Sequence, residues 1–221
     1  MQPANVLLAD DHPLMLMAMT MIVARRHQVV GTCENGNDLV SMANGRMPDV
    51  VVTDIDMPEL NGIDAAAEIM ANVPNVKVIF YTATTHTAGF RNAMYTGAHG
   101  YVVKSEPAET LLTAIECVLN GEQFVSESVQ QLAQEFSAAA DAAAVPDLSL
   151  LTHRQMQILQ MIGQGASSKQ IAYQLNLSVK TVEFHRGNLM HRFGRFSMPE
   201  LLLMAVQQGF IRYAEGTDKA G

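Results

Sequence analysis

Short apolar runs, each closed by a polar residue, recur through the first half of the chain. Val6–Ala9 is followed by the acidic pair Asp10 and Asp11. Val50–Thr53 is followed in the same way by Asp54. Runs this short and this apolar are typical of strands buried on both faces, as in a parallel sheet. Functional groups of open α/β sheets gather just beyond the carboxyl ends of the strands, so we expect these carboxylates to lie together.

Two further apolar runs end in groups that can contact an anion. Residues 78–81 are followed by the hydroxyl of Thr82, and residues 101–103 by the ammonium group of Lys104. Mg²⁺ prefers carboxylate oxygens as ligands, and a carboxylate can act as a nucleophile that carries an aspartyl-phosphate. Each residue alone has a simpler explanation. Asp11 could cap the first helix, Thr82 could end a strand, and Lys104 could be a solvated surface charge. Their shared position at strand ends favours one site that holds Mg²⁺ and accepts a phosphoryl group.

Helical patterns separate the apolar runs. The expected strands lie near residues 5–10, 28–33, 49–54, 77–82 and 100–104. This alternation predicts an α/β fold, a five-stranded doubly wound parallel sheet with helices on both faces. Residues 13–24 are too short to span a bilayer, and acidic residues precede them where a signal peptide needs positive charge. We interpret this methionine-rich segment as a buried first helix. Cys33 and Cys117 show no metal-binding spacing, which fits a cytoplasmic protein.

The net charge of −8 conceals two differently charged parts of the chain. Residues 1–146 hold 6 Lys and Arg against 17 Asp and Glu, which gives −11. Residues 147–221 hold 8 against 5, which gives +3. This asymmetry indicates an acidic module joined to one that faces nucleic acid. Between them, the alanine-rich residues 137–145 have the composition of a linker. Residues 129, 132 and 136 lie at the spacing of a short helix.

Helix-capping signals head each segment of the last third of the chain. The capping-box pattern begins at Thr152, Ser167 and Ser197. Ser178 can cap a fourth helix. These signals predict four short helices, of which residues 168–175 and 179–193 form a helix-turn-helix. At 100° per residue, the second of them places Val182 and Leu189 on an apolar stripe, and leaves the opposite face free for a major groove.

The first module resembles the CheY-like receiver domain of two-component response regulators. The resemblance rests on Asp10-Asp11, Asp54 followed by Met57-Pro58 and Gly62, Thr82-Ala83, and Lys104. It implies that Asp54 is the phosphoacceptor. It implies the Mg²⁺ ligands Asp10, Asp11, Asp54 and the backbone carbonyl of Asp56. It also implies that Thr82 and Lys104 stabilise the phosphoryl group, and that Thr82 and Tyr101 form a switch pair. Ser105 follows Lys104 where many receivers carry proline, which should alter the next loop.

The last module resembles the LuxR-type helix-turn-helix of NarL/FixJ regulators. The resemblance rests on Leu151–Arg154, Gly165, Lys169–Ala172 and Ser178–His185. Some relatives carry lysine at the positions of Glu183 and Gly187, so their base contacts cannot be transferred. The expected DNA-binding residues are Lys169, Lys180, Thr181, Glu183, Phe184, Arg186, Asn188 and Arg192. The basic members suit phosphate contacts, and the others suit base edges. Glu183 has the alternative role of favouring the helix dipole.

Four segments follow from these resemblances. They are a receiver domain at 1–121, a linker with a short helix at 122–148, a DNA-binding domain at 149–214 and a disordered tail at 215–221. The resemblance implies that a sensor histidine kinase phosphorylates Asp54, and that the phosphorylated chain dimerises and binds promoter DNA. The linker residues Val129, Leu132 and Phe136 are candidates for the dimer surface. RNA polymerase is a further candidate partner, and no membrane contact is expected.

Two other functions fit parts of the sequence. An apolar strand before Asp54-Ile55-Asp56 matches the signature of haloacid-dehalogenase-like phosphatases, which would turn over a phosphate ester. That family normally carries the motif near the N-terminus and needs no helix-turn-helix. The chain could also act only through protein partners, in which case its last module would show no salt-sensitive DNA affinity. We favour a regulator of transcription that is not an enzyme.

Overall fold

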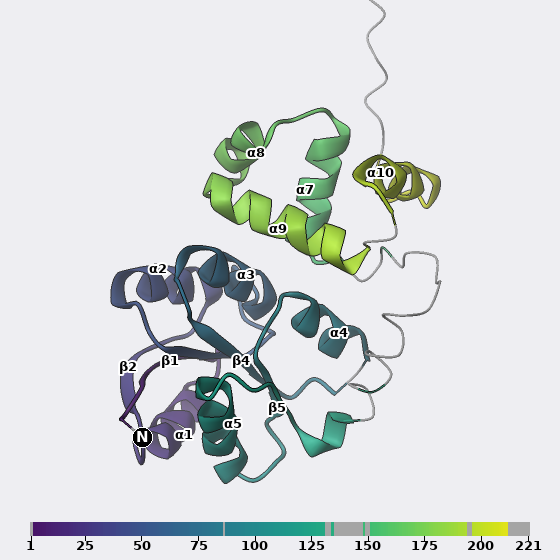
Figure 1. Cartoon of the computed structure of the whole chain (residues 1–221). Helices are drawn as coiled ribbons and strands as arrows, with labels where there is room; N and C mark the ends of the chain where they lie inside the picture. The colour runs from purple at the N-terminus through teal and green to yellow at the C-terminus, as the bar shows by residue number, and fades with distance from the viewer. Residues whose placement is uncertain are drawn as a thin grey trace, which may run out of the picture. The chain divides into compact units, whose positions relative to one another are not determined.

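The chain divides into two compact units, residues 1–144 and 145–221 (Figure 1). The computed structural model describes residues 2–85, 87–130, 134, 148, 151–193 and 196–211. The expected tail, 215–221, therefore lies outside the described residues. No helix among these residues is both long and apolar enough to cross a bilayer.

The first unit is built on a parallel sheet in the order β2-β1-β3-β4-β5-β6. The strands are β1 (Asn5–Ala9), β2 (Gln28–Cys33), β3 (Val50–Thr53), β4 (Lys77–Thr82), β5 (Gly100–Val103) and β6 (Phe124–Val125). β1, β3 and β4 are almost wholly buried, as their apolar sequences predicted. The order reverses direction at β1, where a doubly wound sheet opens its binding crevice.

The sixth strand corrects the prediction of five. β6 pairs with β5 through Gly100 opposite Phe124 and Tyr101 opposite Val125. The backbone N–H of Phe124 donates to the carbonyl of His99 at 3.0 Å. β6 comprises only two residues, which is too short for the apolar-run pattern to register. The segment expected to begin the linker therefore extends the sheet instead.

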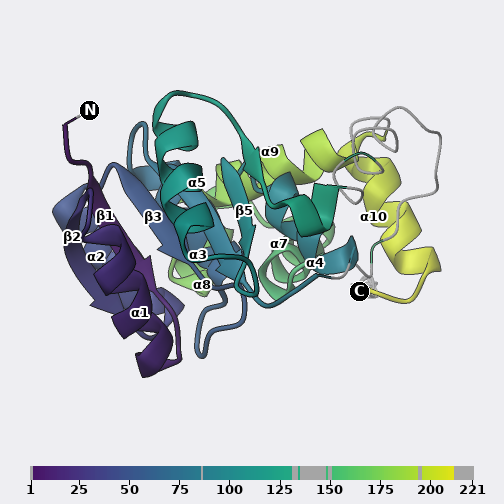
Figure 2. The same cartoon turned by 90° about the horizontal axis from the view of Figure 1, so that it is seen from below.

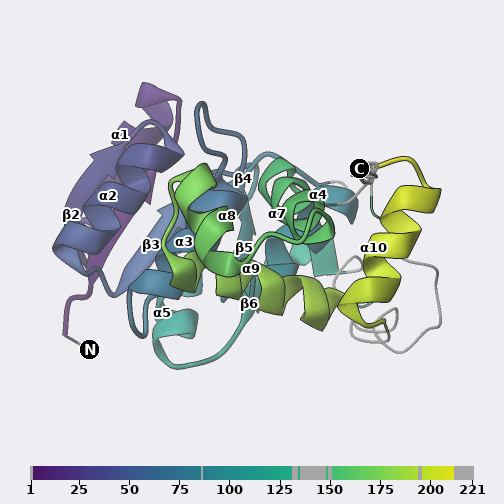
Figure 3. The same cartoon turned by 90° about the horizontal axis from the view of Figure 1, so that it is seen from above.

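Helices cover both faces of this sheet. They are α1 (Pro13–Val23), α2 (Gly36–Arg46), α3 (Gly62–Asn72), α4 (Thr87–Tyr95) and α5 (Glu109–Leu119). One buried cluster joins the strands to α1 and α5, which lie in front of the sheet in Figure 2. The other cluster joins them to α2, α3 and α4, and Figure 3 shows α2 on that opposite side. The doubly wound prediction is confirmed.

The first helix differs from its prediction. α1 buries Leu16, Met19 and Val23, but Leu14, Met17 and Met21 are 80%, 62% and 69% exposed. A helix on a sheet buries one stripe, whereas this helix is apolar on all sides, so the pattern could not mark the exposed face. The sequence correctly placed Pro13 in the first turn, where its missing N–H costs nothing.

The described residues of the second unit form the predicted four helices. They are α7 (His153–Gly163), α8 (Ser168–Leu175), α9 (Val179–Arg192) and α10 (Met198–Gln207). The three predicted capping boxes are present, and the Ser178 side chain accepts from the N–H of Thr181. Asn176 adopts the left-handed conformation, with φ 54°, in the turn between α8 and α9. This helix-turn-helix packs on a core that includes Ile158, Ile171 and Val182.

The segment after β6 contains a 3-10 helix, Glu127–Val129. Val129 is fully buried in the cluster that contains Phe90 and Tyr101. It is therefore part of the first unit's core and does not present the dimer surface that its spacing suggested. The other two residues of that expected helix, Leu132 and Phe136, lie outside the described residues.

Candidate functional site

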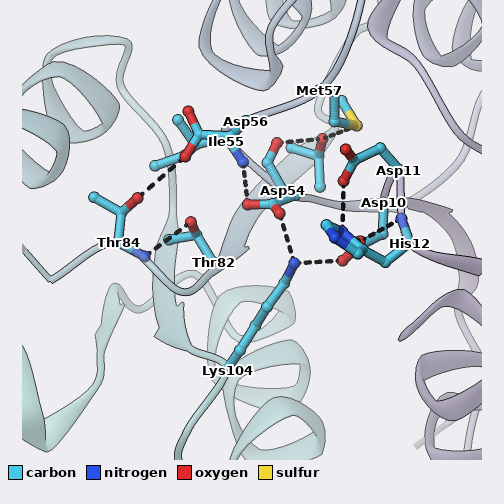
Figure 4. A network of polar contacts seen from close by, with 11 residues as sticks. Asp10, Asp11, His12, Asp54, Ile55, Asp56, Met57, Thr82, Thr84 and Lys104 are labelled. Carbon is cyan, nitrogen blue, oxygen red and sulfur yellow. Dashed lines mark hydrogen bonds and ion pairs between the residues drawn. The ribbon is translucent and has the colours of Figure 1, made fainter. Parts of the chain in front are cut away.

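The strand register brings the polar residues at the ends of the central strands together. Ala9 pairs with Thr53, so Asp10 and Asp54 follow at the same level of the sheet. Lys104, one residue beyond β5, reaches between these two carboxylates (Figure 4). Its Nζ lies 2.6 Å from Asp10 Oδ2 and 2.5 Å from Asp54 Oδ2. Residues far apart in the chain thus form one charged cluster.

This cluster is almost shielded from water. Asp10 is fully buried, Asp54 is 5% exposed, and the Lys104 side chain is 11% exposed. Burial alone lowers the pKa of a lysine, but the hydrogen bonds and charges of Asp10 and Asp54 outweigh it and raise the pKa of Lys104. Lys104 therefore stays charged at neutral pH. Two carboxylates around one cation leave a net negative charge that suits a further cation.

The loop after β3 folds tightly around Asp54. The N–H of Ile55 donates to Asp54 Oδ1 at 2.6 Å, and the N–H of Gly62 donates to the carbonyl of Ile55 at 2.8 Å. A Cβ atom on Gly62 would lie 1.8 Å from the backbone oxygen of Asp54. Only glycine lets the start of α3 approach so closely, which explains why Gly62 stands at this spacing from Asp54.

Asp11 and His12 stand at the exposed side of the buried carboxylates. His12 Nδ1 lies 2.7 Å from Asp11 Oδ1 and 3.4 Å from Asp10 Oδ1. His12, rather than Asp11, is the N-cap residue of α1, and its side chain makes no capping hydrogen bond. Sequence reasoning missed His12, although its position directly after the acidic pair was a usable signal.

The donor set at this edge fits a divalent cation. Asp10 Oδ2 and Asp11 Oδ1 are buried oxygens that lie 2.6 Å from Lys104 Nζ and 2.7 Å from His12 Nδ1. Such oxygens match the preference of Mg²⁺. The side chain of Asp56, two residues after Asp54, points elsewhere and accepts from the Thr84 hydroxyl at 3.3 Å.

The expected switch residues lie beside this loop. Thr82 is 1% exposed at the end of β4, and its hydroxyl oxygen accepts from the N–H of Thr84 at 3.2 Å. Tyr101 is fully buried, and its hydroxyl donates to the Thr84 carbonyl at 2.7 Å. Burial, together with the charges of Asp54 and Asp56, raises the pKa of Tyr101, which keeps the hydroxyl protonated. Thr84 thus joins Thr82, Asp56 and Tyr101, a link that sequence reasoning did not find.

In the second unit, α9 has one buried and one open face. Val182, His185 and Leu189 are fully buried. The open face carries exposed Lys180, Glu183 and Gly187. Partly exposed residues flank it, and these are Phe184, Arg186, Asn188 and Arg192. Lys169 on α8 is also exposed. The structure therefore brings seven of the eight expected DNA-binding residues to the surface.

Thr181 is the exception. It is 1% exposed, and its hydroxyl lies 2.8 Å from that of Ser178 at the start of the helix. Glu183 accepts a short hydrogen bond from Ser168 at the start of α8 and lies 3.8 Å from Arg186 Nε. It therefore links the two helices of the helix-turn-helix, a role beyond the favourable dipole contact expected of an acid in the first turn.

His185 is a buried polar residue that the sequence did not single out. Neither ring nitrogen has a hydrogen-bond partner among the described residues. Burial, with a contribution from Arg154, lowers the pKa of His185 to about 4. The imidazole is therefore neutral at physiological pH and acts as a core side chain.

Two family models match the two units. The response regulator receiver domain matches residues 6–116, and bacterial regulatory proteins of the luxR family match residues 149–205. The oxygen regulatory protein NreC of Staphylococcus aureus is 31% identical over 216 residues, which are 95% of this chain and 100% of NreC. The chain is a response regulator. It carries a receiver domain and a LuxR-type helix-turn-helix domain, and belongs to a family of transcription regulators rather than enzymes.

Solved structures resemble this response regulator in fold. The receiver domain of RcsB from Salmonella enterica serovar Typhimurium, solved in the presence of the phosphomimetic BeF3−, is 26% identical, with a TM-score of 0.56. That match covers 59% of this chain and 99% of the RcsB domain. RcsB bound to the promoter P1flhDC is 24% identical, covers 93% of this chain and 100% of RcsB, and has a TM-score of 0.58. The haloacid-dehalogenase alternative has no support from these relatives.

Proposed function

We propose that this response regulator accepts a phosphoryl group on Asp54 from a sensor histidine kinase, with Mg²⁺ as cofactor. The observation that carries this proposal is the Lys104 ammonium group held between the buried carboxylates of Asp10 and Asp54. The related RcsB receiver, solved with a phosphomimetic, supports it. In the cytoplasm the chain would meet both the kinase and DNA.

Each residue has a distinct role in the proposed transfer. An Asp54 carboxylate oxygen forms the new bond to phosphorus, while the bond from phosphorus to the donor atom breaks and the donor keeps its electron pair. Mg²⁺, when bound by Asp10, Asp11, Asp54 and the Asp56 carbonyl, would offset the charge of the phosphoryl oxygens. Lys104 then contacts those oxygens as a point charge. The Thr82 hydroxyl donates a hydrogen bond to one of them.

Phosphorylation with a small phosphodonor tests the assignment. Acetyl phosphate with Mg²⁺ should add one phosphoryl group that is acid-stable and base-labile. Asp54→Asn should abolish the labelling, because an amide is not a nucleophile for this transfer. Omission of Mg²⁺ should suppress it. Full labelling of the Asn variant on another residue would contradict the assignment.

The switch is proposed to begin at Thr82. When its hydroxyl turns to the phosphoryl group, it leaves the Thr84 N–H that it now contacts at 3.2 Å. The Thr84 carbonyl also accepts a hydrogen bond from the Tyr101 hydroxyl. The loop that contains Thr84 and the Tyr101 side chain on β5 would therefore move together. Phosphorylation should then favour a homodimer. Sedimentation of the full chain with and without BeF3− tests this step, and an unchanged monomer–dimer equilibrium would contradict it.

DNA is the proposed partner of the open face of α9. Lys169, Lys180, Arg186 and Arg192 would contact phosphates, which position the helix without reading sequence. Phe184 could contact a thymine methyl, and Asn188 could pair with adenine. Glu183, already bound to Ser168, would position α8 against α9 rather than accept from cytosine. For Thr181, we propose a role through the Ser178 cap, since its side chain is buried. RNA polymerase remains a further proposed partner.

A further inference from the structure

We infer that His12 is an additional ligand of the metal site and makes it selective for nitrogen-preferring transition metals. This inference rests on the proposed metal site of the receiver. Its basis is the cluster formed by Asp10, Asp11 and His12, whose carboxylate oxygens and imidazole nitrogen all lie within 4.8 Å of one another. Asp10 is buried, Asp11 is half-buried and His12 is exposed.

Two of the spacings between these donor atoms are near those of neighbouring ligands in an octahedron. Metal–ligand bonds of about 2.1 Å place neighbouring donors about 3.0 Å apart. His12 Nδ1 lies 2.7 Å from Asp11 Oδ1 and 3.4 Å from Asp10 Oδ1, on either side of that value. Both spacings that involve His12 are therefore already close to the value that a shared ion would impose.

The neighbouring contacts leave these donor atoms available. Lys104 occupies Oδ2 of Asp10, and Oδ1 accepts from the backbone N–H of His12 at 3.0 Å, which leaves that oxygen a further lone pair. The His12 side chain, 74% exposed, makes no capping hydrogen bond to α1. The backbone contact with Asp10 and the 2.7 Å contact of Nδ1 with Asp11 Oδ1 hold the ring beside the two carboxylates (Figure 4). An ion bound there would replace the contact between His12 and Asp11 with bonds to both.

The donor atoms of Asp10, Asp11 and His12 determine which metal ions bind more tightly. Mg²⁺ prefers oxygen and would draw little from an imidazole. Neutral imidazole suits Ni²⁺, Co²⁺ and other first-row ions, and affinity for a given site rises from Mn²⁺ toward Ni²⁺. His12 should therefore raise affinity for Ni²⁺ much more than for Mg²⁺. The receiver would then respond to the identity of the available divalent metal.

Electron spin-echo spectroscopy of Mn²⁺-loaded full-length protein without a polyhistidine tag tests the ligation directly. The wild type should show modulation from a coordinated ¹⁴N nucleus, and His12→Gln should lose it. His153→Gln, which removes an exposed histidine from α7, is the matched control and should keep it. Absence of the nitrogen coupling from the wild type, or its survival in His12→Gln, would overturn the inference.

Calorimetric titration with metal chlorides tests the selectivity. His12→Gln should weaken Ni²⁺ binding about tenfold or more and Mg²⁺ binding less than about twofold. Equal effects on both metals, or none on either, would contradict a ligand role. Mg²⁺-dependent labelling of Asp54 should persist in the control variant His153→Gln. Loss of labelling in the wild type would count against the proposed function, whereas intact labelling without nitrogen coupling would count against His12 alone.

Discussion

The receiver site and the DNA-facing helix hold their charged side chains in opposite surroundings. In the receiver, Asp10 and Asp54 are buried on either side of Lys104, and this contact within the chain offsets part of their negative charge. On α9, Lys180 is exposed, and the partly exposed Arg186 lies 3.8 Å from Glu183. The chain itself supplies most of the contacts of the first set, whereas the charges of the second set face solvent.

This difference determines what a substitution should change. Altering the receiver edge disturbs buried contacts, so the free energy of unfolding should change along with phosphorylation. Altering the open face of α9 removes solvated groups, so the free protein should be almost unaffected and the DNA complex should weaken.

Gly62→Ala should destabilise the receiver by about 3 kcal/mol, because the new Cβ would lie 1.8 Å from the Asp54 backbone oxygen. Urea denaturation monitored by circular dichroism measures the change. Gly45→Ala in α2 is the control, since nothing lies within 4 Å of its Cβ, and it should stabilise by about 0.5–1 kcal/mol. Equal stability of the two variants would show that the loop around Asp54 is not tightly packed.

Phe184→Ala and Asn188→Ala should each cost about 1–3 kcal/mol on the cognate DNA site only. Both side chains flank the open face of α9, where base edges would lie. Fluorescence anisotropy with the cognate duplex and with single-base variants measures the loss. Preference should relax at one or two base pairs, with unfolding unchanged. A uniform loss on all sequences would assign these residues to positioning instead.

His185 is a buried polar residue of the DNA-binding domain whose ring has no hydrogen-bond partner among the described residues. Its folded pKa of about 4 is below the usual value of 6.5, so the unfolded state binds the proton first as pH falls. Stability is thus present above pH 6.5 and declines toward pH 4. Between pH 7 and 5 the loss should be about 2 kcal/mol.

Hydrogen exchange of the α9 amides in the full chain measures this pH dependence. His185→Leu should make the stability of that helix less dependent on pH, because it removes the titrating group. His191→Leu on the exposed side of the same helix is the control and should keep the wild-type dependence. A pH dependence unchanged by His185→Leu would show that another group titrates.

Arg186→Ala should produce the smallest effect, a similar weakening on every DNA sequence. If Arg186 contacts one phosphate, the slope of the logarithm of affinity against the logarithm of salt concentration should decrease by about 0.9. Anisotropy titrations at several salt concentrations determine the slope. An unchanged slope with a sequence-dependent loss would place Arg186 among the base-reading residues.

The sequence predicted those features that depend on local patterns. Apolar runs located the central strands, and capping boxes located the helices of the second domain. The two-residue strand β6 is too short to produce an apolar run. The helix α1 is apolar on its exposed side as well, so its sequence does not distinguish the buried face from the exposed one. His12 was missed because its contacts with Asp10 and Asp11 depend on the geometry at the start of α1. The burial of Thr181 likewise follows from its contact with Ser178.

The central claim is that phosphorylation of Asp54 increases the DNA affinity of the open face of α9. The measurement is the affinity of the full chain for a duplex selected from random-sequence DNA, with and without acetyl phosphate and Mg²⁺. We expect phosphorylation to tighten binding at least about tenfold, a coupling of about 1.4 kcal/mol, and Asp54→Asn to show no response. Equal affinities of the wild type in both conditions, with Asp54 fully labelled, would contradict the account.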